Sequence, residues 1–114
     1  MKKFGNGQIW LVNFDPSFGS EYKKVRPALI VQADRYIESS NLLTVIPISS
    51  KIDKQKELDV FLACDSQNRL MVDSLIKIHQ ISSFDKGRFI KLIGEIKSEI
   101  MKEVGDHIRL FLNL

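Results

Sequence analysis

The stretch Gln8-Ile9-Trp10-Leu11-Val12-Asn13-Phe14, ended by Asp15-Pro16, is the first of several short apolar runs that decide the fold. Apolar runs of this length, bounded by turn residues, are typical of β-strands. Similar runs follow, and we expect further strands at residues 27–32, 41–48, 58–63, 70–80 and 90–93. Pro47 cannot donate a backbone hydrogen bond, so the strand at residues 41–48 is expected to be an edge strand or to contain a bulge.

A short turn or helix is expected to begin at Asp85-Lys86-Gly87-Arg88. Near Ser98 the spacing of the apolar residues changes from that of a strand to that of a helix. From there, one apolar stripe recurs at the spacing of an α-helix and consists of Ile100, Val104, Ile108 and Phe111. We expect this stripe to be mostly core, with part of it near a subunit contact. Many short strands followed by a terminal helix predict an α+β domain whose antiparallel sheet is curled or barrel-like.

Composition narrows the class of protein. The 114 residues suit one domain, and 44% of them are hydrophobic, enough for a core. No apolar stretch approaches the roughly 20 residues that cross a bilayer, and no signal peptide is apparent, so a cytoplasmic protein is expected. Cys64 is the only cysteine, which rules out an intrachain disulfide, and we expect it to be a small core residue.

Two segments at the ends of strand-like runs carry groups suited to chemistry. Gly19–Pro27 places three cations within four residues, and Val45–Lys51 places two hydroxyls and a lysine just past a strand. Arginine, lysine and hydroxyl groups hold phosphodiesters and stabilise negative charge at phosphorus. If the two segments meet in space, the chain has a phosphate-handling site that needs no metal.

The same residues resemble a known family. The opening Gly7–Pro16, the Gly19-Ser20-Glu21 triplet and Arg26-Pro27-Ala28-Leu29-Ile30-Val31 are similar to the start of the MazF/PemK/Kid toxins of bacterial toxin–antitoxin pairs. The match continues, in order, through Pro47-Ile48-Ser49-Ser50, Asp73-Ser74, His79-Gln80-Ile81, Asp85-Lys86-Gly87-Arg88 and Ile93-Gly94. The resemblance spans nearly the whole chain as a single domain, residues 1–114.

The resemblance implies a fold and an activity. The family fold is a small SH3-like or CcdB-like antiparallel β-barrel with a C-terminal α-helix, assembled as a homodimer. Most members are endoribonucleases that cut single-stranded RNA at short sequences and so inhibit translation and growth. They use the substrate's own 2′-hydroxyl and leave a 2′,3′-cyclic phosphate and a 5′-hydroxyl. The resemblance implies no metal and no cofactor, and a cognate antitoxin that covers the RNA site.

The resemblance also assigns catalytic roles. Arg26 matches the family's catalytic arginine, and Ser49 stands where many members have a catalytic threonine. In one branch of the family an Arg-x-Asp pair precedes the glutamine matched by Gln80, and here those places hold Lys77 and His79. This departure keeps a cation but replaces a carboxylate with an imidazole, whose ordinary pKa suits proton transfer. His79 is therefore the third catalytic candidate, while a structural role for it stays open.

The remaining candidates are expected to bind RNA. Cations near the strand ends suit contacts with the phosphate backbone, although each alone could equally be a solvated surface charge; they are Lys23, Lys24, Lys51, Lys77 and Arg88. The loop aromatics Phe18 and Tyr22 could stack on unpaired bases, or pack against the second subunit or the antitoxin. The motif matches add Gly19, Ser20, Glu21, Ser50 and Gln80 to the predicted RNA-binding residues.

Two other readings stay open at the level of sequence. CcdB toxins share the barrel but bind and poison DNA gyrase without cutting RNA, and such a binder needs no phosphate-cleaving pair. The second alternative is a small barrel that binds nucleic acid without catalysis. The presence of both Arg26 and Ser49 favours the nuclease over either.

Overall fold

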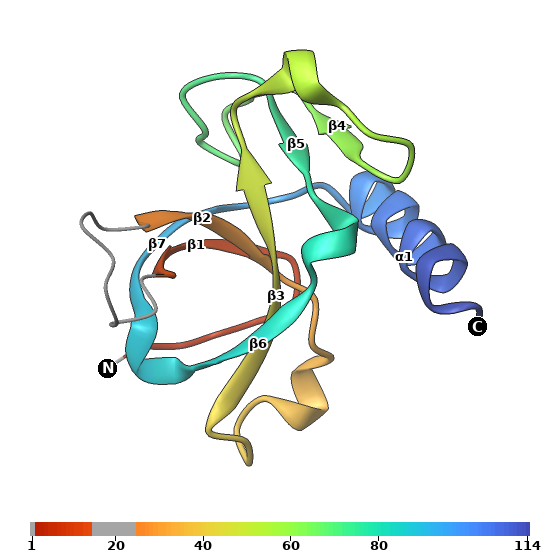
Figure 1. The fold of residues 1–114 in the computed structure, drawn as a ribbon. Helices are drawn as coiled ribbons and strands as arrows, with labels where there is room; N and C mark the ends of the chain where they lie inside the picture. Colours follow the sequence, from red (N-terminus) through yellow and green to blue (C-terminus); the bar gives the residue numbers. More distant parts are fainter. Residues whose placement is uncertain (1, 15–24) are drawn as a thin grey trace, which may run out of the picture.

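The computed structural model describes residues 2–14 and 25–114, and these form seven strands and one α-helix (Figure 1). The strands are β1 (Gln8–Asn13), β2 (Val25–Ile30), β3 (Leu42–Ser49), β4 (Val60–Leu62), β5 (Ser74–Ile76), β6 (Ser82–Asp85) and β7 (Phe89–Glu95). The helix α1 spans Ser98–Leu112, and short 3₁₀ helices lie at η1 (Asp34–Tyr36), η2 (Ile52–Lys54), η3 (Ile78–Gln80) and η4 (Lys86–Arg88). The predicted α+β class is confirmed.

β3 is the strand that joins two parts of the sheet. The strand order is β4-β5-β3-β2-β1-β7, with β6 also paired to β3, and every pairing is antiparallel. Five strands, β6, β3, β2, β1 and β7, curl into the barrel-like half of the molecule, and η4 connects β6 to β7 (Figure 1). β5 and β4 extend the sheet from the far end of β3. Of the two alternatives expected at Pro47, the edge strand is wrong, because β3 has neighbours on both sides. Pro47 lies instead where the ladder is interrupted, between the pairs of β6 with Leu42–Val45 and those of β5 with Ile48 and Ser49.

Both faces of β1, β2 and β3 are buried, each in its own apolar cluster. One cluster takes side chains from four strands of the curl and includes Trp10, Val12, Val45 and Phe89. The other lies under α1 and the β4–β5 extension and includes Ile9, Leu29, Ile46, Ile76 and Val104. Alternate residues of a strand point to opposite faces, which is why neighbouring residues such as Ile9 and Trp10 belong to different clusters.

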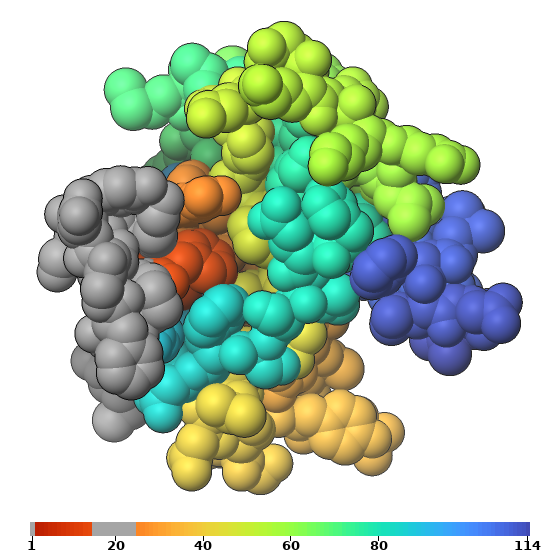
Figure 2. Space-filling view, viewed as in Figure 1, coloured from red at the N-terminus to blue at the C-terminus, as the bar shows by residue number. Residues whose placement is uncertain are grey.

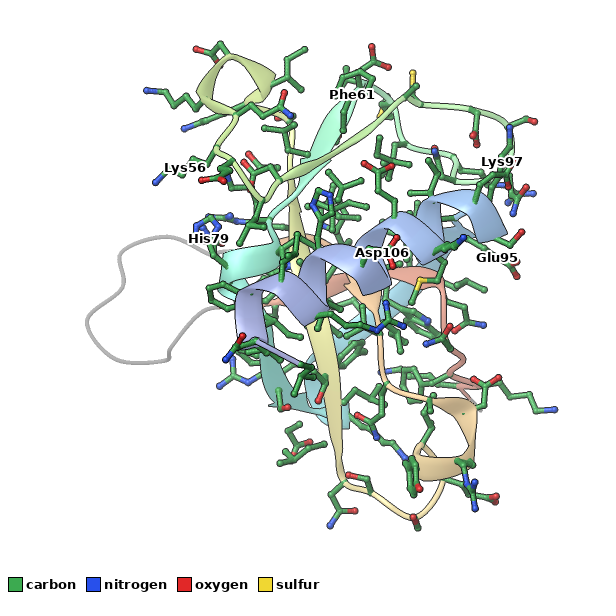
Figure 3. The ribbon with its side chains drawn as sticks, turned by 90° about the vertical axis from the view of Figure 1, so that its right-hand side faces the viewer. Lys56, Phe61, His79, Glu95, Lys97 and Asp106 are labelled. Carbon is green, nitrogen blue, oxygen red and sulfur yellow. The ribbon has the colours of Figure 1, made fainter. Side chains whose placement is uncertain are left out.

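The terminal helix covers the second cluster (Figure 3). Val104 of its predicted stripe is fully buried, and Ile100 and Ile108 pack partly buried beside it. Phe111, at the end of the stripe, is 40% exposed, so the stripe leaves the core in the last turn. Asn113 ends the helix in the left-handed conformation that commonly closes α-helices. Across the described residues, no helix is long and apolar enough to cross a membrane.

The predicted strand at residues 70–80 is wrong in its extent. β5 covers only Ser74–Ile76, and the chain then turns through η3 before β6 resumes pairing with β3 at Ser82. At the interruption Ile78 is buried in the core, and the side chain of Lys77 is buried as well. The alternation of side-chain faces along residues 70–80 predicts one continuous strand, whereas in the structure two short strands, β5 and β6, pair with the same edge of β3.

A buried ion pair fixes this interruption. The Lys77 ammonium donates to Asp59 Oδ2 at 2.6 Å, and the side chain of Asp59 has no exposed surface. Asp59 Oδ2 also accepts from the backbone N–H of Lys56 at 2.8 Å. The Lys77 backbone N–H donates to the Pro47 carbonyl at 3.0 Å. Lys77 therefore links the loop before β4 to the middle of β3.

Cys64 is exposed and not a core residue as expected. It lies after β4, next to Asp73, whose carboxylate accepts the Cys64 backbone N–H at 2.9 Å. Interaction with this carboxylate raises the pKa of the Cys64 thiol above its ordinary value. Because only the thiolate is a strong nucleophile, a raised pKa makes this exposed cysteine less reactive at neutral pH.

The loop between β4 and β5 packs directly on β7 at Gly94. A Cβ atom at Gly94 would lie 2.6 Å from the carbonyl oxygen of Gln67 and from the carbonyl carbon of Asn68. Backbone atoms cannot yield as a flexible side chain can. Only glycine allows this loop to approach the strand so closely.

We predict that Gly94→Ala destabilises the protein by about 1–3 kcal/mol, the usual cost of forcing an extra methyl into a packed site. The free energy of unfolding in urea measures the effect. Gly105→Ala in α1 is the matched control, because the nearest atom to its added Cβ is the Arg109 guanidinium at 3.9 Å. That variant should gain up to about 1 kcal/mol from the better helix propensity of alanine. Equal stabilities of the two variants would contradict the close approach at Gly94.

We further predict that Asp59→Ala costs about 3–5 kcal/mol, because it leaves the Lys77 ammonium buried without its counter-charge. Urea unfolding again provides the measurement. Asp53→Ala, at an exposed position in η2, is the control and should stay within about 0.5 kcal/mol of the wild type. The double variant Asp59→Leu/Lys77→Met should recover most of the loss. A stable Asp59→Ala protein would mean that the pair does not hold the interrupted strand.

Candidate active site

An open cavity of about 660 Å³ lies where the ends of β2 and β3 meet the loop between β4 and β5. It is lined by the start of β2, by residues 48–51 at the end of β3, by residues 69–72 of the loop, and by β1 and β7. In Figure 2 the start of β2, in orange, is at the surface beneath the green loop. Arg26 and Ser49, from the two segments singled out in the sequence, both line this cavity.

The register between β2 and β3 explains why these two residues meet. Ala28 is opposite Pro47, and Leu29 is opposite Ile46. Arg26 lies two residues before Ala28, and Ser49 lies two residues after Pro47, so both are just past the same end of this ladder. The β2–β3 pairing therefore brings a guanidinium and a hydroxyl to one end of the sheet, where both line the cavity.

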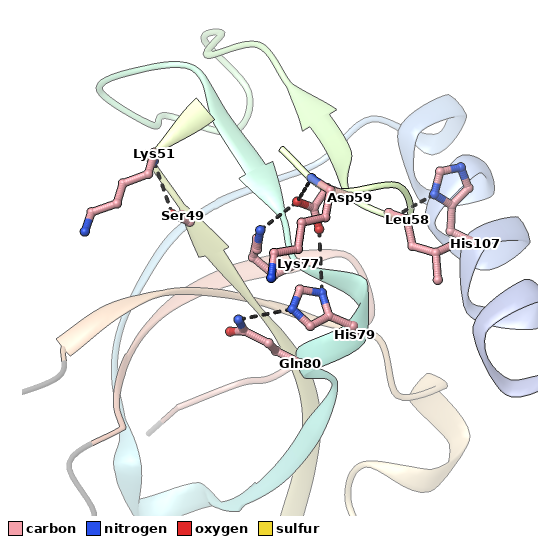
Figure 4. A network of polar contacts seen from close by, with 9 residues as sticks. Ser49, Lys51, Leu58, Asp59, Lys77, His79, Gln80 and His107 are labelled. Atoms are coloured by element: carbon pink, nitrogen blue, oxygen red, sulfur yellow. Dashed lines mark hydrogen bonds and ion pairs between the residues drawn. The ribbon is translucent and has the colours of Figure 1, made fainter. Parts of the chain in front are cut away.

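The Ser49 hydroxyl is oriented by the turn that follows β3. Its oxygen accepts the backbone N–H of Lys51 at 3.2 Å, a local contact typical of serine at the end of a strand (Figure 4). Accepting this bond leaves the hydroxyl proton available for donation to a bound oxygen. Ser50, the neighbouring hydroxyl, also lines the cavity.

The lining of the cavity is strongly cationic. Among its described lining residues are four cations, Arg26, Lys51, Arg69 and Lys91, and no aspartate or glutamate. The guanidinium of Arg26 makes no hydrogen bond or ion pair with residues 2–14 or 25–114. Such a concave surface of one charge sign attracts an anionic ligand. The apolar part of the lining includes Leu11, Pro27, Leu70 and Ile93.

Lys77 and His79 lie in a neighbouring cluster, outside the set of described residues that line the cavity (Figure 4). Lys77 is 8% exposed and bound to Asp59. His79 is partly exposed, with Nδ1 at 3.7 Å from Asp59 Oδ1, which has no hydrogen-bond partner among the described residues. A protonated Nδ1 would face this carboxylate oxygen, as in sites where a carboxylate orients a histidine. The RNA contact of Lys77 and the catalytic role of His79 stay predictions.

The other predicted residues divide between described and undescribed parts of the chain. Gln80 Nε2 lies 3.5 Å from His79 Nε2, beside the same cluster. Arg88 donates to the Asn13 carbonyl at 3.1 Å and lies over the Phe84 ring, so it ties η4 to the end of β1. Phe18, Gly19, Ser20, Glu21, Tyr22, Lys23 and Lys24 lie outside the described residues, and their RNA contacts stay predictions.

Sequence reasoning missed two cations of the cavity, Arg69 and Lys91. Neither belongs to a basic cluster in the sequence, and each looks like an ordinary surface residue. Arg69 reaches the cavity because the loop between β4 and β5 folds over the strand ends, and Lys91 because β7 pairs with β1 at Leu11. Only the strand order, which no local pattern gives, could have identified them.

Comparison with known proteins gives consistent results. Residues 5–112 match the family described as PemK-like, MazF-like toxin of type II toxin–antitoxin system. The chain is 31% identical to Endoribonuclease MazF9 of Mycobacterium tuberculosis over 113 residues, which covers 95% of each protein. It is 32% identical over 108 residues to Endoribonuclease MazF of Staphylococcus saprophyticus, covering 95% of this chain and 90% of that protein.

Solved structures share the fold. A crystal structure of MazF from Deinococcus radiodurans superposes with a TM-score of 0.82 at 23% identity, covering both chains fully. An endoribonuclease in complex with its cognate antitoxin from Mycobacterial species gives a TM-score of 0.78 at 16% identity, covering 98% of this chain and 97% of that one. These matches do not favour the CcdB-like alternative. The chain belongs to the PemK-like, MazF-like toxin family of type II toxin–antitoxin systems.

Proposed function

We propose that this protein is the endoribonuclease toxin of a type II toxin–antitoxin pair. It cuts single-stranded RNA at short sequences without a metal ion, leaving a 2′,3′-cyclic phosphate and a 5′-hydroxyl, and thereby inhibits translation and growth. The observation that carries the proposal is that Arg26 and Ser49 line the same cationic cavity. Relatives that are 31% and 32% identical over 95% of the chain bear the name endoribonuclease, which supports the same activity.

Arg26 stabilises the charge that develops on phosphorus. Attack of the 2′-oxygen on the phosphodiester produces a phosphorane with extra negative charge on its non-bridging oxygens. A guanidinium is permanently charged and planar, so it can donate to two of these oxygens at once. The absence of a competing partner for Arg26 among the described residues supports this role, because the group is free to bind substrate.

Ser49 supplies a hydrogen bond. Its hydroxyl has far too high a pKa to act as a strong base without a partner, so it positions the scissile phosphate or the 2′-hydroxyl. The bond accepted from the Lys51 N–H holds the oxygen in place and leaves its proton for donation to the substrate. Cations along the same lining, such as Lys51, hold the backbone phosphates on either side of the cut.

His79 is the proposed proton-transfer group. Its imidazole lies beside the Asp59 carboxylate oxygen that has no other partner among the described residues, at 3.7 Å, and a carboxylate in this position orients the ring. Cleavage needs such a transfer twice, once from the 2′-hydroxyl and once to the leaving 5′-oxygen. Buried Asp59 would then serve both as the counter-charge of Lys77 and as the support of His79.

The proposed partners follow from the family. The protein acts in the cytoplasm as a homodimer, and a cognate antitoxin covers the RNA-binding surface and blocks it. The structural neighbour that is an endoribonuclease in complex with its cognate antitoxin supports such a partner.

We predict that Arg26→Ala lowers the rate of RNA cleavage by about 10²–10³, the usual cost of removing a group that stabilises transition-state charge. Purified dimer is incubated with a long defined RNA in EDTA, and the cut ends are mapped by primer extension and tested for cyclic phosphate. Arg35→Ala is the matched control, since Arg35 lies in η1, outside the described lining of the cavity, with its guanidinium over the Tyr36 ring. Discrete cuts that persist at the wild-type rate in Arg26→Ala would refute the assignment.

We also predict that Ser49→Ala lowers the cleavage rate about tenfold, the value of one hydrogen bond to a charged group, while Ser50→Ala changes it less than twofold. Single-turnover cleavage of the same RNA measures both rates. Ser49→Thr should keep most of the activity because it retains the hydroxyl. Equal rates for the Ser49→Ala and Ser50→Ala variants would show that the wrong serine has been chosen.

A further inference from the structure

Arg69 adopts a backbone conformation that arginine normally avoids. Its φ is +58°, in the left-handed region, where a side chain with a Cβ is strained and glycine is not. A non-glycine residue at such an angle persists only where its surroundings hold it, and strain of this kind clusters at functional sites. Besides Arg69, Asn113 at the end of α1 is the other described non-glycine residue with positive φ.

A network of local hydrogen bonds holds Arg69 in place. Asp65 Oδ1 accepts the backbone N–H groups of Gln67 and Asn68 at 2.9 and 2.7 Å. Asn68, which is 1% exposed, accepts the N–H groups of Asp65 and Leu70 and donates to the Ala63 carbonyl. The bond from the Asn68 N–H keeps the pKa of the Asp65 carboxyl below its ordinary value, so the carboxylate that holds the turn persists into more acidic solution.

The loop is also fixed from below. Gly94 of β7 lies against the backbone of Gln67 and Asn68, with no space for a side chain between them. The Arg69 N–H donates to the Asp65 carbonyl at 3.0 Å, which closes the turn. Arg69 is therefore presented from a rigid loop, although its own side chain is exposed.

The side chain of Arg69 lines the cavity that Arg26 and Ser49 also line. It makes no hydrogen bond or ion pair with residues 2–14 or 25–114. Lys91 lines the same cavity from β7, and no described lining residue is acidic. The described residues offer the Arg69 guanidinium no partner, so no contact within them explains why arginine occupies this strained position. Its charge is available to an anion in the cavity.

We propose that Arg69 is a substrate-binding residue that contacts an RNA phosphate next to the one that is cut. The inference rests on the proposed function and deepens it, because it adds a second arginine contact that the sequence did not indicate. Arg26 acts at the reacting phosphate from the end of β2. Arg69 binds a neighbouring phosphate from the facing loop, and the two together fix the path of the strand through the cavity.

The experiment uses Arg69→Gly in the full-length dimer. Glycine removes the side chain and relieves the positive φ, so this variant should unfold at a urea concentration equal to or above that of the wild type. Arg69→Asn, a second residue that tolerates this conformation, guards against an effect of added flexibility. Arg35→Gly removes an arginine outside the cavity lining and serves as the charge-matched control.

Binding is measured with a fluorescein-labelled, fully 2′-O-methylated RNA decamer of random sequence, which cannot be cut because its 2′-oxygens are blocked. Fluorescence anisotropy gives Kd over a series of KCl concentrations. We expect Arg69→Gly and Arg69→Asn to weaken binding about tenfold at low salt. The slope of log K against log salt should fall by about 0.7, the contribution of one phosphate contact on a single strand. Arg69→Lys should restore the slope and part of the affinity.

Cleavage of a defined RNA by the same variants separates binding from chemistry. Arg69→Gly should raise KM about tenfold and leave kcat within about threefold of the wild type. If the wild type cuts RNA and Arg69→Gly matches it in Kd, salt slope and KM, the Arg69 inference is wrong and the proposed function stands. If the wild type cuts nothing but the salt slope still falls with Arg69→Gly, the phosphate contact stands and the nuclease proposal fails. A wild type that does not bind the decamer overturns the Arg69 contact outright.

Discussion

The antiparallel register between β2 and β3 is the constraint on which the rest of the molecule depends. It buries alternate residues of both strands in two separate apolar clusters, so a shift of one residue would turn the side chains of each cluster toward the other. The same pairing ends with Ala28 opposite Pro47, two residues from Arg26 along β2 and two residues from Ser49 along β3. One set of hydrogen bonds therefore holds the core together and also places the strand ends that line the cavity.

The distribution of charge follows from that arrangement. The buried carboxylate of Asp59 is neutralised by Lys77 within the sheet extension, away from the lining of the cavity. The cavity itself gathers cations from β2, from the turn after β3, from β7 and from the loop between β4 and β5, without a described carboxylate to compensate them. Like charges held close together repel, and a strained arginine adds to the cost. The fold tolerates this cost at a position where an anion would relieve it.

The sequence predicted those features that local pattern controls. The apolar runs predicted most of the strands and α1. The residues at the strand ends, together with the family resemblance, singled out Arg26 and Ser49, which line one cavity. β6 was missed because Ser82-Ser83-Phe84-Asp85 is polar and mostly exposed, and becomes a strand only through pairing with β3. Asp59 and Lys77 are 18 residues apart and look like surface charges. Arg69 was invisible because its conformation depends on the Asp65–Asn68 turns and on Gly94. Tertiary contacts decide all of these.

The order in which the cavity is assembled has a consequence for synthesis. Its walls come from Leu11 of β1, from β2 and β3, from the loop at residues 69–72, and finally from Lys91 and Ile93 of β7. β7 is the last strand of the described sheet and pairs with β1, so the wall that β7 supplies is added only after β1 to β6 have been made. A nascent chain therefore has no complete pocket until β7 has left the ribosome and paired with β1. A nuclease built in this way gains its substrate pocket only when the last strand of its sheet is in place.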